Sequence, residues 1–207
     1  MTNDGQMNKW DERYDHEGFF YGTQPNYLVA RELPRLDRGR GLFLAEGEGR
    51  NAVFAAGLGH DVVAVDSSAV GRAKALALAA DKGVDLTYRL ADLLADPWDR
   101  ESWDFIVLCF AHLPPGAMAG VHEKVARVLK PGGTLILNSF AKSQFGRTSG
   151  GPPRLEWLHD LAELETQFPG LELEGKEKEV DLDESVGHKG PAMVIELTGH
   201  KAVVSNP

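Results

Sequence analysis

The fold is decided by residues 42–51, which read LFLAEGEGRN. The apolar run at 42–44 predicts a short buried strand, because the strands of a parallel sheet are covered on both faces. Gly47 and Gly49 follow the strand and permit a tight turn that a ligand can approach closely. An alanine-rich helix is expected over 51–58. Its first turn would present unpaired N–H groups and a partial positive charge to that ligand.

Strand and helix patterns alternate from this segment to about residue 140. We expect strands over 41–45, 61–66, 84–89, 104–110 and 134–140, and helices over 51–58, 70–82 and 117–129. Such alternation predicts βαβ units and a parallel sheet with helices on both faces. After residue 140, leucines at 155, 158, 161 and 164 predict one more helix. Two strand-like stretches then follow, 171–182 and 192–198, and are expected to pair antiparallel.

The length, charge and composition limit the classes to which the protein can belong. The 207 residues suit a single domain, with 1–40 as an N-terminal cap or lid and 41–207 as the core. The net charge of −9 disfavours a nucleic-acid partner, which demands clustered Lys and Arg. A polar N-terminus and the lack of a run of about 18 apolar residues predict neither a signal peptide nor a membrane span. We therefore expect a cytoplasmic protein, monomeric or homodimeric, with a small-molecule substrate.

Cysteine and charge patterns add two expectations. The single cysteine, Cys109, excludes an internal disulfide and a multi-cysteine zinc site, and no metal is expected. Because it falls inside the most apolar strand, it is expected to be a buried, unreactive thiol. The charged stretch 172–184 is expected to be a solvated edge strand, where mixed Lys and Glu discourage pairing with other chains.

Two aspartates follow predicted strands. Asp66 ends the second strand, about 20 residues after the glycines, where a carboxylate can accept both ribose hydroxyls of a nucleoside cofactor. The alternative is a helix cap. Asp92 follows the third strand and is placed to accept a hydrogen bond from an adenine amino group. The alternative for Asp92 is an ordinary loop aspartate.

Seven short motifs occur in order along almost the whole chain. They are WDERY at 10–14, YGTQPN at 21–26, GEGRN at 47–51, AVD at 64–66, ADL at 91–93, HLPP at 112–115 and LKPGG at 129–133. In this order they resemble the class I S-adenosylmethionine-dependent methyltransferases, particularly the branch that includes tellurite-resistance and thiopurine methyltransferases. Each motif is moderately specific, and their joint order is highly specific.

The resemblance implies a fold, a cofactor and an activity. The fold would be a Rossmann-like, doubly wound α/β sheet of seven strands, mostly parallel, with an antiparallel last strand. The cofactor would be S-adenosylmethionine, leaving as S-adenosylhomocysteine, and the methyl acceptor a small molecule such as a thiol, tellurite or selenite. The cofactor-binding residues would be Ala45, Glu46, Gly47, Gly49, Asn51, Asp66, Ser67, Ala91, Asp92, Leu93 and Cys109.

One position departs from the family pattern. Family members usually carry an acidic residue two positions before the first glycine of the turn. Here Phe43 stands at that position, and Ala45 replaces the glycine. Glu46 is the nearest carboxylate, and we expect it to bind the cofactor's ammonium group through a shifted geometry.

The acceptor side is expected to involve the lid and two histidines. His112 follows the most apolar strand and is the candidate catalytic residue, as a base or as an orienting group. A hydrogen bond from a loop histidine to the backbone is the alternative. Residues 10–26 would fold over the site as a lid. The remaining candidates for the lid and the acceptor are Trp10, Arg13, Tyr14, Tyr21, Asn26, Arg147 and His188.

Three other functions use similar features. A nucleotide-dependent oxidoreductase also needs a glycine turn and an acidic strand end, but no Tyr-x-x-x-Lys pattern occurs in the sequence. A nucleic-acid methyltransferase would carry an Asn- or Asp-Pro-Pro-aromatic motif where this chain has residues 109–112. A non-catalytic protein that binds S-adenosylmethionine is the third alternative.

Overall fold

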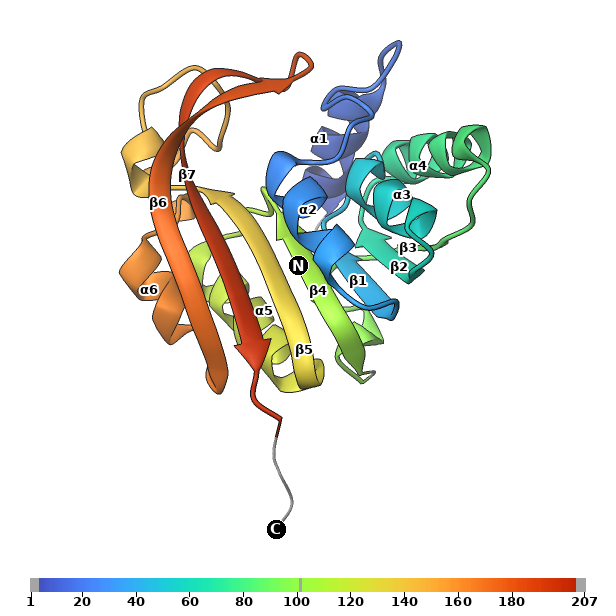
Figure 1. Ribbon diagram of the computed structural model, residues 1–207. Coiled ribbons are helices and arrows are strands. Elements are labelled where there is room, and N and C mark those ends of the chain that lie inside the picture. Colours follow the sequence, from blue (N-terminus) through green and yellow to red (C-terminus); the bar gives the residue numbers. More distant parts are fainter. Residues whose placement is uncertain (1–3, 101, 204–207) are drawn as a thin grey trace.

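A single seven-stranded sheet forms the centre of the molecule (Figure 1). The computed structural model describes residues 4–100 and 102–203. The strands are β1 (Arg40–Leu44), β2 (Asp61–Asp66), β3 (Thr87–Leu90), β4 (Trp103–Cys109), β5 (Leu129–Phe140), β6 (Leu171–Glu184) and β7 (His188–Lys201). Their order is β3-β2-β1-β4-β5-β7-β6. The first five strands pair in parallel, and β7 is antiparallel to both β5 and β6. The expected Rossmann-like sheet with its antiparallel last strand is confirmed.

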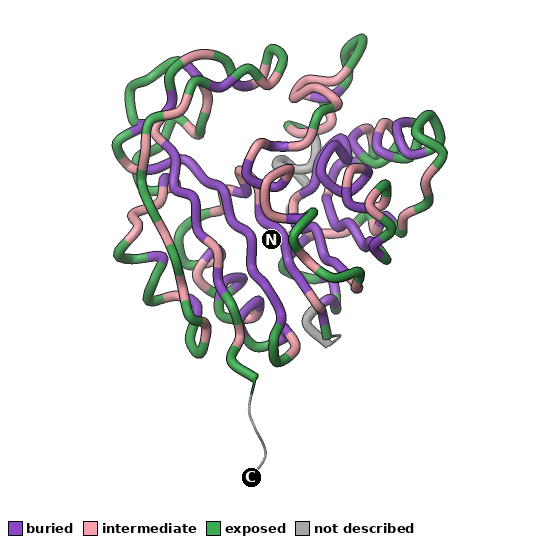
Figure 2. Tube along the Cα trace, viewed as in Figure 1, coloured by how far each residue is buried: buried purple, intermediate pink, exposed green. Residues whose placement is uncertain are grey.

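Helices cover both faces of the sheet. They are α1 (Asp4–Tyr14), α2 (Tyr27–Glu32), α3 (Arg50–Gly57), α4 (Ala69–Lys82), α5 (Pro115–Val128) and α6 (Leu161–Thr166). Successive residues of β1 point to opposite faces. Phe43 packs among residues of α2, α3 and α4, whereas Leu42 and Leu44 pack among residues of α5 and α6. The central strands are accordingly the most continuously buried part of the chain (Figure 2).

Local signals set both ends of α4. The hydroxyl of Ser68 accepts a hydrogen bond from the Gly71 N–H and caps the helix. Gly83 ends the same helix in the left-handed conformation, with φ of 68°. Of the described residues, none forms a helix that is both long and apolar enough to cross a bilayer.

Only the second part of the helix expected from the leucines at 155–164 forms as an α-helix. A short 3-10 turn spans Leu155–Trp157, the chain then extends, and α6 begins only at Leu161. Asp160 caps α6, since its carboxylate accepts the Glu163 N–H. Leu158 packs with Phe140, while Leu164 packs in the main core, so the leucines do not share one face.

The last two strands are longer than expected and form an arm. Each has 14 residues, and the turn at 185–187 joins them. Figure 1 shows this hairpin reaching past the end of β5 toward the loop that follows α1. The hairpin therefore brings residues from near the C-terminus to the same edge of the sheet as the turn after β1.

Gly49 fixes how closely α3 approaches α4. Its φ is +89°, and an added Cβ would lie 2.4 Å from the Cβ and 2.8 Å from the Cα of Ala75 in α4. Only glycine meets both conditions, because a side chain would be strained by the backbone conformation and would also overlap a helix backbone. The second glycine of the turn is therefore required by packing as well as by the turn itself.

Gly49→Ala should lower the free energy of unfolding by about 2–4 kcal/mol, the sum of left-handed strain and overpacking. Gly120→Ala is the matched control, because Gly120 is exposed in the middle of α5 with open space around it. That control should be neutral or stabilising by up to about 1 kcal/mol. Urea unfolding of both variants measures the difference. Equal stabilities would contradict this account of the turn.

Candidate functional site

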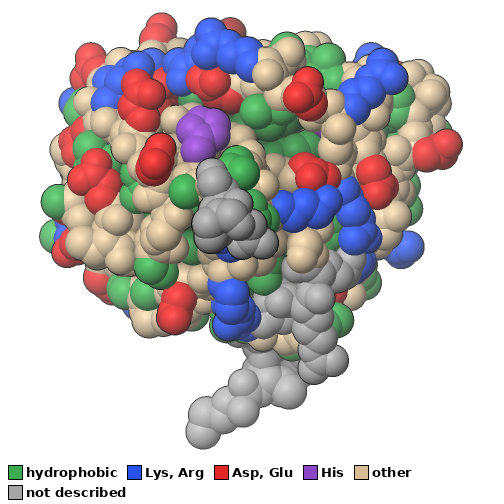
Figure 3. Space-filling view, turned by 60° about the horizontal axis from the view of Figure 1, so that its bottom comes forward, with side chains coloured by type: hydrophobic (Ala, Val, Ile, Leu, Met, Phe, Trp, Pro, Cys, Tyr) green, Lys and Arg blue, Asp and Glu red, His purple; other side chains and the backbone are tan. Residues whose placement is uncertain are grey.

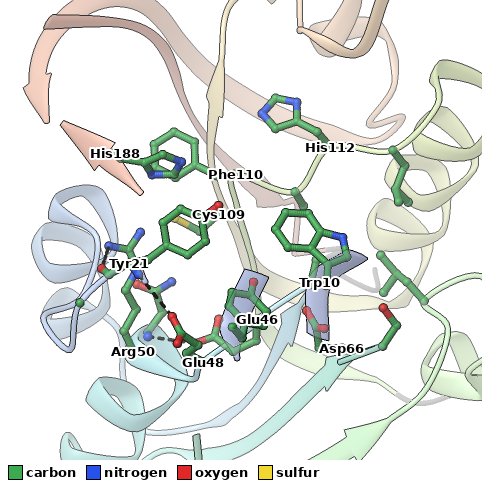
Figure 4. A pocket seen from close by; sticks show the side chains of 18 of the residues that line it. Trp10, Tyr21, Glu46, Glu48, Arg50, Asp66, Cys109, Phe110, His112 and His188 are labelled. Atoms are coloured by element: carbon green, nitrogen blue, oxygen red, sulfur yellow. Dashed lines mark hydrogen bonds between the residues drawn. The ribbon is translucent and has the colours of Figure 1, made fainter. Parts of the chain in front are cut away.

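A cavity lies at the carboxyl ends of the central parallel strands (Figure 4). It sits where the strand order reverses around β1, the usual ligand position in open α/β sheets. Three parts of the chain line it: the N-terminal segment, the loops after β1 to β4, and the hairpin. The lining residues are Trp10, Tyr14, Tyr21, Gly22, Ala45, Glu46, Glu48, Arg50, Asn51, Asp66, Ser67, Asp92, Leu93, Cys109, Phe110, Ala111, His112, Leu113 and His188.

The Asp66 carboxylate holds the glycine turn against β2. Its Oδ2 accepts the Gly47 N–H at 2.9 Å, and its Oδ1 accepts the Ser68 N–H at 2.8 Å. Burial raises the pKa of Asp66, and these backbone hydrogen bonds oppose the rise. Each carboxylate oxygen keeps a further lone pair. Asp66 can therefore accept hydroxyl groups from a ligand while it fixes the turn.

Glu46 occupies the start of α3. Its Oε1 accepts the N–H groups of Asn51 and Ala52, at 2.9 and 2.7 Å. The sequence predicts unpaired N–H groups in the first turn of this helix. For these two N–H groups the prediction is wrong, because Glu46 accepts both. Burial raises the pKa of Glu46 to about 7, even though these hydrogen bonds and the charge of Arg50 oppose the rise. A carboxylate with that pKa changes charge near neutral pH.

The segment 10–26, here called the N-terminal lid, closes one side of the cavity. Asp11 accepts hydrogen bonds from the Ser68 hydroxyl at 2.6 Å and the Val70 N–H at 3.1 Å, which anchors α1 at the start of α4. Tyr14 reaches the turn, since a Cβ on Gly47 would lie 2.5 Å from its Oη. Within the lid, Trp10, Tyr14 and Tyr21 line the cavity directly, as Figure 4 shows for Trp10 and Tyr21.

Glu48 attaches the loop of the lid to the glycine turn. Its Oε2 accepts the Phe20 N–H at 2.8 Å and the Tyr21 N–H at 3.3 Å. Its Oε1 accepts a hydrogen bond from Lys74 of α4 at 3.1 Å, and Lys74 also donates to the carbonyls of His16 and Gly18. The hairpin holds the other side of the loop, because the Gly187 N–H donates to the Phe20 carbonyl at 2.9 Å.

The Glu184 carboxylate joins the lid, α3 and the hairpin. Arg50 donates to its Oε2 at 2.9 Å, His188 Nδ1 lies 2.8 Å from the same oxygen, and Asn26 donates to its Oε1 at 2.9 Å. Burial alone would raise the pKa of Glu184, but His188 and Arg50 outweigh burial and lower it to about 2. The expectation that the whole stretch 172–184 is solvated is therefore wrong at Glu184, and also at Leu182, which is buried.

His112 lines the cavity, but the protein already surrounds both of its ring nitrogens. Nδ1 lies 2.8 Å from the Trp157 carbonyl, and Nε2 lies 3.4 Å from both the Phe140 N–H and the Ser139 hydroxyl. Burial lowers the pKa of His112 to about 4. The backbone hydrogen bond matches the alternative considered from the sequence, and a catalytic role for His112 stays a prediction.

Two groups of predicted residues lie at the cavity. Those that line the cavity are Trp10, Tyr14, Tyr21, Ala45, Glu46, Asn51, Asp66, Ser67, Asp92, Leu93, Cys109, His112 and His188. Gly47, Gly49 and Ala91 shape the surrounding backbone, and the Ala91 N–H donates to the Asp66 carbonyl at 2.9 Å. Burial raises the pKa of the Cys109 thiol, which suits the expected unreactive role.

Three predicted contacts lie away from the cavity. Arg147 pairs with Glu179 at 2.6 Å, and both side chains are largely solvent-accessible. Asn26 caps α2, where its Oδ1 accepts the Leu28 N–H at 3.0 Å. Arg13 donates a hydrogen bond to Tyr21 Oη at 3.2 Å and does not itself line the cavity. These residues support the lid and the hairpin or lie on the surface, and the structure does not bring them to the cavity wall.

Several lining residues and one supporting residue are not predicted from the sequence. Phe110, Ala111 and Leu113 line the cavity beside His112, and their position directly after β4 is a signal that would have found them. Glu48 stands between the two glycines of the turn and could also have been proposed. Glu184 has no local signal. Among residues 4–100 and 102–203, no three His, Cys, Asp or Glu side chains are arranged to hold a metal ion.

Comparisons with known proteins agree with this arrangement. Residues 42–133 match a family model described as a methyltransferase domain. No curated protein matches the sequence. TehB from Haemophilus influenzae superposes with a TM-score of 0.71 at 18% identity, covering 95% of this chain and 67% of that one. A protein solved in a study of disulfide-to-thioacetal conversion in echinomycin biosynthesis superposes with a TM-score of 0.74 at 18% identity. The match covers 100% of this chain and 93% of that one.

A third likeness includes a ligand. The N-methyltransferase NodS from Bradyrhizobium japonicum WM9, solved with S-adenosyl-L-homocysteine, gives a TM-score of 0.70 at 12% identity and covers 94% of this chain and 97% of its own. At these identities the likenesses concern the fold. The turn after β1, Asp66 and the loop at 91–93 all fall inside the matched segment 42–133. The chain thus has the Rossmann-like methyltransferase fold, and residues 42–133 match the methyltransferase domain family.

Proposed function

We propose that the protein is an S-adenosylmethionine-dependent methyltransferase that acts on a small acceptor. The observation that carries this proposal is the Asp66 carboxylate, which faces the cavity at the end of β2 while it holds the glycine turn. That turn, Asp66 and the loop at 91–93 lie within the segment that matches a methyltransferase domain. The lid closes over the same place.

The residues present fit this cofactor. Asp66 keeps lone pairs for two ribose hydroxyls, Asp92 and Leu93 line the adenine end, and Glu46 is a carboxylate for the ammonium group. When bound, the cofactor supplies a methyl group activated by a sulfonium, so the protein's part is placement and exclusion of water. Here the lid and the hairpin enclose the cavity from two sides.

The enclosed cavity supports a small acceptor. Tyr21, Phe110 and Leu113 give it apolar walls, and the loop of the lid is attached both to Glu48 and to the hairpin. The net charge of −9 does not suit a polyanionic acceptor. Basic and acidic side chains are interspersed on the face drawn in Figure 3, which brings forward the end of the molecule opposite the cavity. Thiols and chalcogen oxyanions remain the first acceptors to test, because the sequence motifs resemble the tellurite-resistance and thiopurine branch.

Two rival functions make different binding and turnover predictions. A nucleotide-dependent oxidoreductase would bind nicotinamide dinucleotides in the same crevice. Calorimetric binding of S-adenosylmethionine without binding of NAD supports the methyltransferase. Transfer of labelled methyl groups to thiols, selenite, tellurite or phenols separates an enzyme from a protein that only binds the cofactor.

Asp66→Ala should weaken S-adenosylmethionine binding by roughly 1–3 kcal/mol, because ribose hydroxyls would lose their acceptor. Isothermal titration calorimetry measures the change, and circular dichroism checks the fold. Asp61→Ala is the matched control, because Asp61 is an exposed residue at the opposite end of the same strand. It should bind like the wild type. If a folded Asp66→Ala variant also bound normally, the assigned ribose position would be wrong.

Affinity for S-adenosylmethionine should rise several-fold between pH 6 and pH 7.5. The pKa of Glu46 is about 7, so the side chain is mostly neutral at pH 6 and gains charge as the pH rises. Only the ionised carboxylate attracts the ligand's ammonium group. Calorimetry across this range tests the slope, with Glu46→Gln as the variant that cannot titrate. The same slope in Glu46→Gln would exclude Glu46 as the ammonium partner.

A further inference from the structure

His188 is held in one tautomer by Glu184. Its Nδ1 lies 2.8 Å from Glu184 Oε2, and the low pKa of Glu184 keeps that carboxylate ionised, so it can only accept. The hydrogen of a neutral His188 ring must therefore be on Nδ1. The other nitrogen, Nε2, then carries a free lone pair.

The Nε2 atom of His188 has no hydrogen-bond partner within the described ranges, and part of its surface is exposed. His188 as a residue lines the cavity (Figure 4), and Gly150 lies beside the edge of the ring that carries Nε2. His112 differs, because a backbone N–H and a hydroxyl already approach its Nε2.

Aromatic rings hold His188 in place. The ring centroids of Tyr21 and Phe110 each lie 4.5 Å from the imidazole, and that of Phe140 lies 5.0 Å away. Tyr21 belongs to the lid and Phe110 follows β4, so the imidazole stands between the lid and the strand ends. Tyr21 and Phe110 also line the cavity, so an acceptor there would lie against these two rings.

We propose that His188 is the general base of methyl transfer, that Glu184 is its positioning residue, and that the acceptor is a nucleophile with a proton to lose. This inference rests on the proposed function. Amines, hydroxyls and thiols belong to this class of acceptor, whereas proton-free nucleophiles such as thioethers do not. A general base within reach contributes about 10²–10⁴ in rate.

The proton and charge balance is complete. The acceptor atom forms a bond to the methyl carbon as the sulfur–methyl bond of the donor breaks, and the electron pair of that bond stays on the sulfur. The acceptor's proton passes to Nε2 of His188. The resulting imidazolium is stabilised by the adjacent Glu184 carboxylate and later releases the proton to solvent.

The charges around His188 determine its pH dependence. Glu184 favours the protonated ring, Arg50 and Arg13 oppose it, and Tyr21 and His112 are the other titratable groups nearby. Burial is the largest effect and lowers the pKa of His188 below its usual value, although Glu184 raises it. Activity should therefore fall only when the pH drops below about 6.5, the usual histidine pKa. Removing the charge of Glu184 should move that fall to still lower pH.

The test compares His188→Ala and Glu184→Gln with His200→Ala. His200 is an exposed residue at the far end of the same strand and is the matched control. Methyl transfer from labelled S-adenosylmethionine is measured with 2-mercaptoethanol, phenol and aniline, and with the proton-free dimethyl sulfide and pyridine. We expect transfer to a proton-bearing acceptor, a loss of about 10²-fold or more in His188→Ala, and no change in His200→Ala. Glu184→Gln should lower kcat more than it raises KM.

Two further readouts do not depend on turnover. Nitrogen NMR at pH 7.5 should show His188 with the hydrogen on Nδ1, and a less uniform tautomer in Glu184→Gln. Calorimetry should show S-adenosylmethionine binding within about twofold of wild type in His188→Ala, a negligible free-energy difference. Loss of cofactor binding by the wild type would instead contradict the proposed function itself.

Three results would overturn the base assignment. They are a hydrogen on Nε2 of His188, a His188→Ala variant with wild-type rate and pH profile, and better transfer to the proton-free acceptors than to their proton-bearing partners. If no acceptor in the panel reacts, the NMR tautomer still decides, because an Nε2 that carries a hydrogen cannot accept the proton.

Discussion

The structure depends on one buried carboxylate between two backbone N–H groups. One oxygen of Asp66 accepts the N–H of Gly47 in the turn after β1, and the other accepts the N–H of Ser68 before α4. A buried carboxylate without such donors would be costly, and the turn without this acceptor would leave a buried N–H unpaired. The carboxylate and the backbone N–H groups therefore satisfy each other's need for a hydrogen-bond partner. They also leave the carboxylate facing the cavity, where the proposed ribose lies.

Two glutamates extend this arrangement to the rest of the site. Glu48 connects the turn to the lid, and Glu184 connects the hairpin to Arg50 at the start of α3. The hydrogen bonds that Glu48 and Glu184 accept are charge-assisted and largely buried, and such hydrogen bonds are the strongest available to side chains. The parallel half of the sheet thus provides the proposed cofactor site. The antiparallel hairpin provides His188, the group we assign to the acceptor.

Sequence patterns predict this fold where the cause of structure is local. The strand at 42–44, the glycines and the acid at position 66 are all recognisable within a few residues of one another in their βαβ unit, and the structure brings them together. The two ends of α4 have local causes as well, because the Ser68 cap and the Gly83 stop act within one helical turn. The lid was predicted differently, from the resemblance of its motifs to a family.

The failures come from contacts that are distant along the chain. Glu184 ends a stretch whose composition is typical of a solvated edge strand. Its hydrogen-bond partners Arg50 and Asn26 lie 134 and 158 residues away along the chain. The leucines at 155–164 have helical spacing, but the spacing does not reveal that Asp160 begins a new helix or that Leu158 packs with Phe140. Distant contacts also surround His112, whose catalytic role stays a prediction. The hydrogen bonds at its two nitrogens come from residues 27 to 45 positions away.

The most direct test of the central claim is a crystal structure grown with S-adenosylhomocysteine. The account predicts the nucleoside in the crevice between the turn at 45–49 and the end of β2, with both ribose hydroxyls on the Asp66 carboxylate. An empty crevice at saturating ligand, or a ribose held by other residues, would contradict it.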